Sequence, residues 1–334
     1  MSRADGPSDG GYGNKHRAFL QALFSRQTII LDEAKPIIAN IETCENPDRP
    51  IASEDVDQTD FENYIYSINN EISPFDYEIR SSIHQTSRER VYALINTTSD
   101  ALTQMSTIHT ADEIAFVKRV LDAMFDTHNT PRAEVMAVTS MQALKLSKDP
   151  HRRETQTQSA QGGLTMSQAE KVLADMVLEG WFEQSENGYY SLSPRALMEL
   201  RSWLVHTYNE APEDVDEGDE EPHERVKSCE LCQDIVTVGQ RCPNLPCNAR
   251  LHNHCVRNMF RAQRESEKCP TCSTNWKDAP PVGEEAAPRG SGGARRPVNG
   301  TGPRRSTNEP AVRRSAVIEM EDDEDESDAG IESE

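Results

Sequence analysis

Apolar residues recur at two different spacings along the first hundred residues. In some segments they return every three or four positions, which indicates an amphipathic helix, and in others they alternate with polar residues, which indicates a strand. Asp32 is expected to cap the second helix. The predicted order is helix, strand, helix, helix and hairpin, at residues 16–26, 28–31, 32–42, 61–72 and 77–97.

A related pattern follows in the second hundred residues. Thr110 and Glu113 have the spacing of a capping box at a helix start, and Asn187 and Gly188 lie where a hairpin is expected to turn. Pro131 is expected as the first residue of a helix. Helices are predicted at residues 111–128, 131–146, 167–180 and 194–208, with a hairpin at 181–192.

Both regions have the element order of a winged-helix domain. In the second, Gly180 is expected to end one helix and Ser193 to cap the next, while Trp181 and Phe182 are expected in the core. The patterns therefore predict an α+β multidomain protein that begins with two tandem winged-helix domains, at residues 15–105 and 106–209.

Winged helices often bind DNA, but the second domain is acidic where it would meet phosphates. Its groove-facing helix, residues 167–179, and the following wing carry Lys171 among five acidic residues: Glu170, Asp175, Glu179, Glu183 and Glu186. A DNA-reading surface is expected to be basic. We therefore predict that these domains dock proteins and that DNA is bound only indirectly or weakly.

The first helix offers a candidate docking surface. Phe19, Leu20, Leu23 and Phe24 lie on one face of it and are more apolar than the edge of a small domain requires. The alternative is that these four side chains fill the core of their own domain.

Composition indicates that part of the chain lies outside folded domains. Only 35% of the 334 residues are hydrophobic, and two acidic runs hold nineteen acids, most of the net charge of −22. Disorder is predicted at residues 1–14, 210–226 and 278–334. No apolar run is long enough to cross a membrane and no secretory signal opens the chain, so we expect no membrane association.

Seven of the eight cysteines lie between Cys229 and Cys272, with the spacing C-x2-C, C-x4-C, H-x2-C and C-x2-C. Such short pairs are typical of zinc sites, and four pairs make two sites. Spacing alone allows neighbouring pairs to join or alternate pairs to interleave. His252 is favoured over His254, which abuts Cys255. A disulfide framework is the less favoured alternative, because the spacings suit metal and no secretory signal precedes them.

The order of four cysteines, one histidine and three cysteines resembles RING and PHD fingers, both of which are cross-braced. This resemblance implies two interleaved Zn²⁺ sites in a finger at residues 227–277. The ligands of the first would be Cys229, Cys232, His252 and Cys255, and those of the second Cys242, Cys247, Cys269 and Cys272.

Residues around these pairs favour RING over PHD. PHD fingers usually carry an aromatic residue where this chain has Glu267. The RING resemblance implies a groove for a ubiquitin-conjugating enzyme, formed by Leu231, Met259, Phe260 and Pro270. Many active RING ligases place a cationic residue just after the last cysteine, where this chain has Ser273 and Thr274.

Two winged helices followed by this finger resemble the first non-SMC element, the RING subunit of the SMC five-six complex in DNA repair. The likeness rests on three stretches, at residues 18–34, 178–204 and 229–272. It implies a nuclear RING-type ubiquitin ligase subunit, weak without its MAGE-type partner, with a kleisin subunit as second partner and no covalent catalyst. The alternatives are a purely structural subunit and a PHD-like chromatin reader.

The acidic tail contains one short apolar segment. Val317, Ile318 and Met320 precede six consecutive acids, which resembles a SUMO-interacting motif that adds a strand to a sheet edge.

Overall fold

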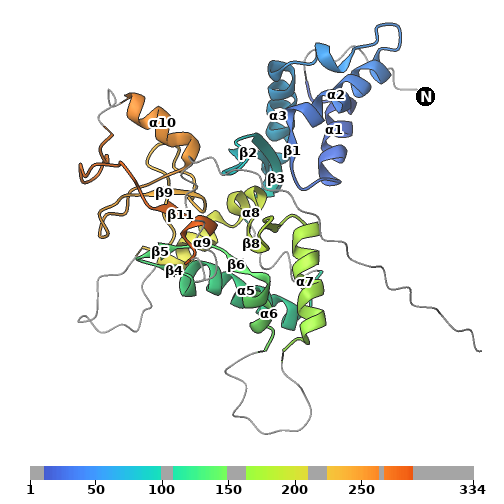
Figure 1. The fold of residues 1–334 in the computed structure, drawn as a ribbon. Helices are drawn as coiled ribbons and strands as arrows, with labels where there is room; N and C mark the ends of the chain where they lie inside the picture. Colours follow the sequence, from blue (N-terminus) through green and yellow to red (C-terminus); the bar gives the residue numbers. More distant parts are fainter. Residues whose placement is uncertain (1–10, 99–107, 149–162, 210–223, 263–266, 289–334) are drawn as a thin grey trace, which may run out of the picture. The chain divides into compact units, whose positions relative to one another are not determined.

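The structure is a computed structural model, shown in Figure 1, and describes residues 11–98, 108–148, 163–209, 224–262 and 267–288. We call residues 11–98 the N-terminal part, residues 108–209 the central part and residues 224–288 the finger. All described residues belong to one unit of the chain, which ends at Pro288. Among them, no helix combines the length and the apolar character that spanning a membrane would require.

The N-terminal part packs three helices against a three-stranded antiparallel sheet. Its elements are α1 (Asn14–Phe24), β1 (Ile29–Ile30), α2 (Leu31–Glu45), α3 (Gln58–Ile72), β2 (Tyr77–Ile83) and β3 (Arg90–Asn96). The sheet order is β1-β3-β2. Three aromatic side chains connect the helices with the sheet. Phe61 of α3 lies edge-on to Phe19 of α1 and to Tyr92 of β3, with ring centroids 5.9 and 4.7 Å away, respectively. The predicted hairpin is confirmed.

Two predictions for this part are wrong. Asp32 does not cap α2, because β1 runs directly into the helix and Ile30 becomes its N-cap, with Glu33 accepting a hydrogen bond from the Ile30 N–H. The apolar face of α1 is also mostly core. Phe19 and Leu23 are buried and Leu20 is half-buried, which leaves only Phe24, 66% exposed, as a surface residue. The alternative, that this face fills its own core, is the better description.

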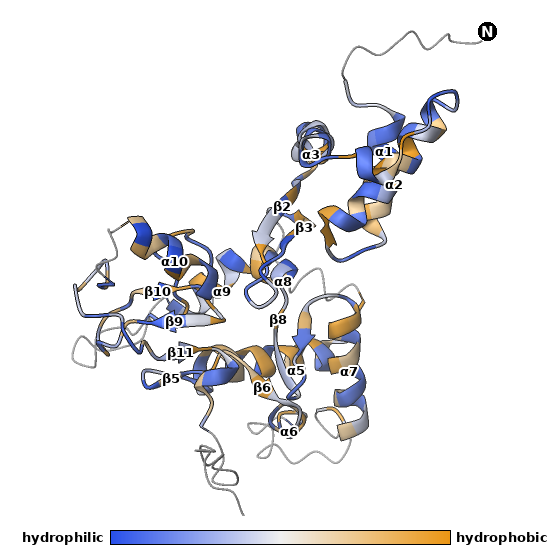
Figure 2. Ribbon diagram, turned by 45° about the horizontal axis from the view of Figure 1, so that its top comes forward, coloured by the Kyte–Doolittle hydropathy of each residue, from blue (hydrophilic) through white to orange (hydrophobic). Residues whose placement is uncertain are grey.

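The central part contains a second three-stranded antiparallel sheet, in the order β6-β8-β7. Apolar residues lie along α5 and α7 and contribute to one core (Figure 2). Its helices are α5 (Ala111–Asp122), continued by a π-helical turn (Ala123–Thr127), α6 (Ser140–Lys145), α7 (Met166–Leu178), α8 (Pro194–Glu199) and α9 (Arg201–Asn209). Its strands are β4 (Asn129–Thr130), β5 (Ala133–Glu134), β6 (Val138–Thr139), β7 (Phe182–Gln184) and β8 (Tyr189–Leu192).

The helix N-caps predicted in this part, at Thr110 and Ser193, are confirmed. The Thr110 N–H donates to the Glu113 carboxylate at 2.7 Å, and Ser193 Oγ accepts from the Ala196 N–H at 3.1 Å. Trp181 and Phe182 are buried as predicted.

The helix predicted from Pro131 to residue 146 is wrong in its first half. Pro131 lies in the turn between β4 and β5, and α6 begins only at Ser140, where Thr139 caps it. The intervening residues 135–138 are all buried. Such a short apolar run does not reveal by its period whether it is helix or strand. The predicted last helix is likewise divided, because Leu200 separates α8 from α9.

The finger is built on a small sheet and one helix. Its elements are β9 (Gly239–Arg241), β10 (Arg250–Leu251), α10 (Asn253–Ala262) and β11 (Pro281–Val282), with the sheet order β10-β9-β11. The predicted boundary at residue 277 falls before β11, which pairs with β9. The finger therefore continues into the predicted tail. The proposed SUMO-interacting residues Val317, Ile318 and Met320 lie outside the described residues.

Candidate metal centre

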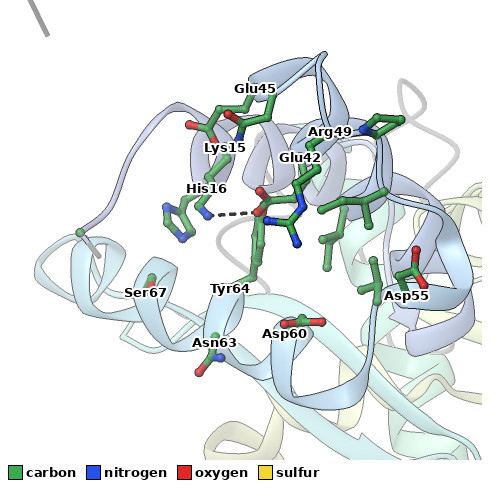
Figure 3. A pocket seen from close by; sticks show the side chains of 16 residues that line it. Lys15, His16, Glu42, Glu45, Arg49, Asp55, Asp60, Asn63, Tyr64 and Ser67 are labelled. Carbon is green, nitrogen blue, oxygen red and sulfur yellow. Dashed lines mark hydrogen bonds and ion pairs between the residues drawn. The ribbon is translucent and has the colours of Figure 1, made fainter. Parts of the chain in front are cut away.

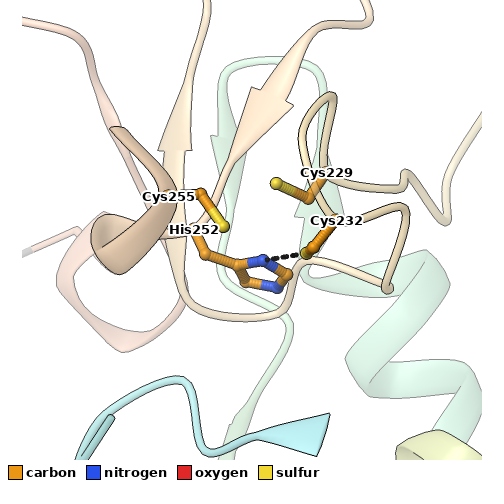
Figure 4. A group of neighbouring side chains, drawn as sticks. All are labelled: Cys229, Cys232, His252 and Cys255. Carbon is orange, nitrogen blue, oxygen red and sulfur yellow. Dashed lines mark hydrogen bonds between the residues drawn. The ribbon is translucent and has the colours of Figure 1, made fainter. Parts of the chain in front are cut away.

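Eight side chains of the finger gather into two clusters. The first contains Cys229, Cys232, His252 and Cys255 (Figure 4), and the second contains Cys242, Cys247, Cys269 and Cys272. Within each cluster the possible ligand atoms all lie within 4.8 Å of one another. The first and third pairs of the motif thus meet in one place and the second and fourth in another. This is the interleaved arrangement, and the structure brings together the two sets of residues that the RING resemblance implied.

The spacing within the second cluster fits a tetrahedral metal ion. The sulfurs of Cys242 and Cys272 are 3.4 Å apart, and those of Cys247 and Cys269 are 3.7 Å apart. Metal–sulfur bonds of about 2.3 Å in a tetrahedron would place two sulfurs about 3.8 Å apart. A disulfide would instead require about 2.05 Å. All of these cysteines are free thiols, so the disulfide alternative does not describe the structure.

The two C-x2-C pairs are presented by turns of the same construction. After the first pair, the Gln233 N–H donates to the Cys229 carbonyl at 2.9 Å, and after the last pair, the Ser273 N–H donates to the Cys269 carbonyl at 3.0 Å. Gln233 and Ser273 both have positive φ, 65° and 60°. The backbone thus directs both sulfurs of each pair to one side of a tight turn, as a shared metal ion requires.

His252 is oriented by its second ring nitrogen. Its Nδ1 lies 3.2 Å from the sulfur of Cys232 (Figure 4). Its Nε2 lies 3.1 Å from the Ile235 carbonyl oxygen. A proton on Nε2 would donate to that carbonyl and leave Nδ1 free to bind a metal. His254, the rival, stacks on His252 with ring centroids 4.9 Å apart and belongs to neither cluster.

Thiol acidity in the clusters depends on whether a cation is present. Burial raises the pKa of the Cys242, Cys247 and Cys255 thiols, that of Cys255 to about 11, because an uncompensated thiolate is poorly solvated there. Hydrogen bonding to Thr274 lowers the pKa of Cys272 to about 6. A divalent metal ion would bind the thiolates and release the protons of the buried thiols.

The four residues predicted to receive a conjugating enzyme divide into two exposed and two buried ones. Leu231 is 42% exposed and Pro270 is exposed, whereas Met259 and Phe260 are only 9% and 8% exposed. The Phe260 ring lies 6.0 Å from Trp276 in the core of the finger. Met259 and Phe260 are therefore corrected to core residues, because both belong to the buried apolar cluster that also contains Trp276.

A buried ionic cluster that the sequence did not reveal joins the finger to the central part. Glu134 of β5 accepts hydrogen bonds from Lys227 Nζ at 2.8 Å and from Arg250 Nε at 2.6 Å, and each side chain is at most 2% exposed. Burial alone would raise the pKa of Glu134, but Arg250 and Lys227 together hold it below its ordinary value. Glu134 was placed in a predicted helix, so no sequence signal connected it with the finger.

The N-terminal part has a cleft of about 1080 Å³ between α1, α2 and α3 (Figure 3). Glu42 accepts from Lys15 at 3.0 Å and from the Tyr64 hydroxyl at 2.5 Å. Burial, followed by this hydrogen bond, raises the pKa of Tyr64 far above its ordinary value. Among the lining residues, the buried His16 accepts from the Gly13 N–H. These groups satisfy one another and do not form a pair of nucleophile and base.

Comparisons with known proteins agree with this organisation. The family model described as "Nse1 non-SMC component of SMC5-6 complex" matches residues 16–200, more than half of the chain. The chain belongs to the Nse1 family. A second family model, of a RING-like domain, matches residues 229–272 and so spans both cysteine clusters.

Related Nse1 proteins occur in distant organisms. The Nse1 homologue of Rattus norvegicus is 23% identical over 284 residues, covering 85% of this chain and 92% of that protein. Nse1 of Schizosaccharomyces pombe is 24% identical over 282 residues, covering 84% and 97%. A chain from a solved Nse1-Nse3-Nse4 complex matches with a TM-score of 0.59 and 20% identity over 80% of this chain and 97% of that chain, which shows a shared fold.

Proposed function

We propose that this Nse1-family chain binds two Zn²⁺ ions and acts as a RING-type ubiquitin ligase subunit of an SMC5-6 complex in DNA repair in the nucleus. The observation that carries the proposal is the pair of interleaved clusters in a segment matched by a RING-like family model. One cluster offers three sulfurs and a nitrogen and the other four sulfurs, and such donor sets are typical of structural zinc.

The proposed ligase has a positioning role and no covalent catalyst. A conjugating enzyme would dock where the two C-x2-C turns lie close together, since the Thr271 hydroxyl donates to Glu230 at 3.4 Å. The exposed Leu231 and Pro270 belong to these two turns and are the proposed contacts. Holding the charged enzyme in a reactive geometry raises the transfer rate without a nucleophile from the ligase.

Partners are proposed from the family and from the structural match. The likeness to a chain of the Nse1-Nse3-Nse4 complex supports a MAGE-type and a kleisin subunit as partners of this chain. Two winged-helix domains would provide the docking surfaces, because each of the first two parts combines helices with a three-stranded sheet that ends in a hairpin. Ligase activity is expected to depend on the MAGE-type partner, since Ser273 supplies no cation after the last cysteine.

A non-catalytic structural subunit is the second candidate. It is favoured by the burial of Met259 and Phe260, which leaves little apolar surface on α10 for a conjugating enzyme. The buried contacts of Lys227 and Arg250 with Glu134 also fit a finger whose main task is to hold its own chain together.

A ubiquitin-transfer assay with the MAGE-type partner present distinguishes the two. Leu231→Ala and Pro270→Ala are expected to reduce transfer at least about tenfold while zinc content stays unchanged, as lost binding of about 1.4 kcal/mol would. Leu245→Ala is the matched control, because Leu245 is an exposed leucine on another loop of the finger. If all three variants transfer ubiquitin as fast as the unaltered complex, or if the unaltered complex transfers none, the result would favour the structural role. Specific binding of a histone-tail peptide would instead indicate a PHD-like reader.

A further inference from the structure

The turn between β2 and β3 of the N-terminal part reaches the finger through the side chain of Gln85. Gln85 Nε2 donates to the Ile235 carbonyl at 2.9 Å. Its Oε1 accepts from the backbone N–H groups of Thr237 and Val238 at 3.0 and 2.7 Å. A single amide group thus satisfies three backbone groups within a four-residue segment, residues 235–238, which leads from the first cysteine pair to β9.

Three of the four residues in this segment are buried and Val238 is half-buried, so its polar groups need those partners. Ile235, Val236 and Thr237 are all less than 5% exposed. A buried backbone group without a hydrogen bond costs about 1–3 kcal/mol. Gln85 therefore fixes the path of the segment more firmly than an ordinary surface contact would.

The Ile235 carbonyl has a second donor, which is His252 of the first cluster. His252 Nε2 lies 3.1 Å from the oxygen that Gln85 also binds. Because this carbonyl holds the Nε2 proton, it sets the tautomer and the ring orientation that leave Nδ1 facing Cys232. The position of the carbonyl is thus a condition for the geometry of the first cluster.

We propose that Gln85 is a positioning residue for the first metal cluster, through which the hairpin turn of the N-terminal part tunes the metal affinity of the finger. The inference rests on the proposed zinc binding and names a residue outside the finger that controls it. Gln85 acts through Ile235 and His252 and does not touch the metal position itself. Within the part of the chain that the structure describes, the hydrogen bonds of Gln85 reach residues 235, 237 and 238 and no ligand of the second cluster, so the effect is expected at one site.

The Zn²⁺ affinities of the two sites, measured separately, test this proposal. Outer partners of a ligating histidine typically change metal affinity about 10–100-fold. In the full-length chain, Gln85→Ala is expected to weaken one Zn²⁺ site by that factor in competition with a chromophoric chelator, and to leave the other unchanged. Co²⁺ spectra identify the weakened site, because a site with three sulfurs and one nitrogen absorbs differently from a four-sulfur site.

Two further variants test whether the effect comes from the hydrogen bonds of Gln85. Gln85→Glu retains an acceptor for Thr237 and Val238 but loses the donor to Ile235, so it is expected to weaken the same site if the protein remains folded. Gln27→Ala is the matched control, because Gln27 also donates from the N-terminal part to a distant carbonyl, that of Leu178, which belongs to the central part.

The outcomes separate this inference from the proposed function. Two unchanged sites in both Gln85 variants, or equal weakening of both sites, overturns the positioning role and leaves zinc binding intact. Failure of the unaltered chain to bind any Zn²⁺ overturns both. Selective loss at the site with one nitrogen ligand, absent in Gln27→Ala, supports the assignment.

Discussion

Nε of Arg250 donates to the Glu134 carboxylate across 2.6 Å, and the two residues are 116 positions apart in the chain. Lys227 donates to the same carboxylate, so one buried anion serves two buried cations. Arg250 also donates to the carbonyls of Cys247 and Ala249, beside the second cysteine cluster. The central part and the finger therefore share a fully desolvated ionic network, and that network is adjacent to a proposed metal ligand.

Glu134→Gln is expected to be strongly destabilising. The amide keeps the shape of the side chain but leaves Lys227 and Arg250 buried without a negative charge. Breaking a buried ion pair in this way costs about 3–5 kcal/mol. The measurement is the free energy of unfolding of the zinc-loaded chain in denaturant. Its control is Asp234→Asn, which removes an exposed pair with Arg201 and should cost less than about 1 kcal/mol. If both variants lose a similar free energy of unfolding, burial does not make the Glu134 ion pairs more stabilising than an exposed pair.

His84 should make stability depend on pH. The hydrogen bond with Glu183, at 3.1 Å, raises the pKa of His84 against the effect of its burial, and the charge of Glu89 raises it further. Because the folded pKa lies above the unfolded value of 6.5, the contribution of this contact is complete below that pH and disappears as pH rises through the folded pKa. The difference in melting temperature between the unaltered chain and His84→Gln should therefore be larger near about pH 5.5 than near about pH 8.5. A difference that does not vary with pH would contradict the assignment.

Cysteine substitutions should separate the clusters from the remaining thiol. Cys247→Ser removes one of four sulfurs from the second cluster and should reduce bound zinc from about two ions to about one per chain. Cys44→Ser alters an exposed cysteine outside both clusters and should retain both ions. Metal content after gel filtration tests this directly. Two ions retained in Cys247→Ser would refute the assignment of that cluster.

Gly180 ends α7 in a left-handed conformation, with φ at 75°, and an added Cβ would overlap the side chain of Gln27. Gly180→Ala should cost about 1–2 kcal/mol from the backbone alone, with the overlap added to it. Gly188→Ala provides the comparison, because Gly188 has almost the same φ, 77°, but its Cβ would have room. Thermal melting should therefore show a larger loss for Gly180→Ala, and equal losses would mean that Gln27 simply moves aside.

The sequence predicted those features that depend on local spacing. The capping box of Thr110 and Glu113, the two hairpins and the short ligand pairs are set by residues three to about twenty positions apart, where periodicity and turn chemistry act. The joining of these pairs into two clusters was instead implied by the RING resemblance. His252 could be predicted as a cluster member for the same reason, since H-x2-C is itself a local pattern.

Features that depend on packing between distant residues could not be predicted from the sequence. Pro131 and the apolar run after it fit a helix as well as a buried strand, and only pairing between Asn129 and Glu134 shows that a β-turn forms there. The same limit applies to Phe19, whose burial against Phe61 no local pattern distinguishes from exposure on a docking surface. Gln85 and Glu134 meet partners about 100 or more positions away, so their roles appear only in the folded chain.

The separation of Glu134 from its cations has a consequence for the chain as it is synthesised. At about 5–20 residues per second, Arg250 leaves the ribosome roughly 6 to 23 seconds after Glu134. During that interval the carboxylate is hydrated and stands next to an apolar run, residues 135–138, that the finished protein buries. A charge at the edge of such a run opposes its association with other chains. Glu134 can therefore anchor the finger only after both Lys227 and Arg250 have been made.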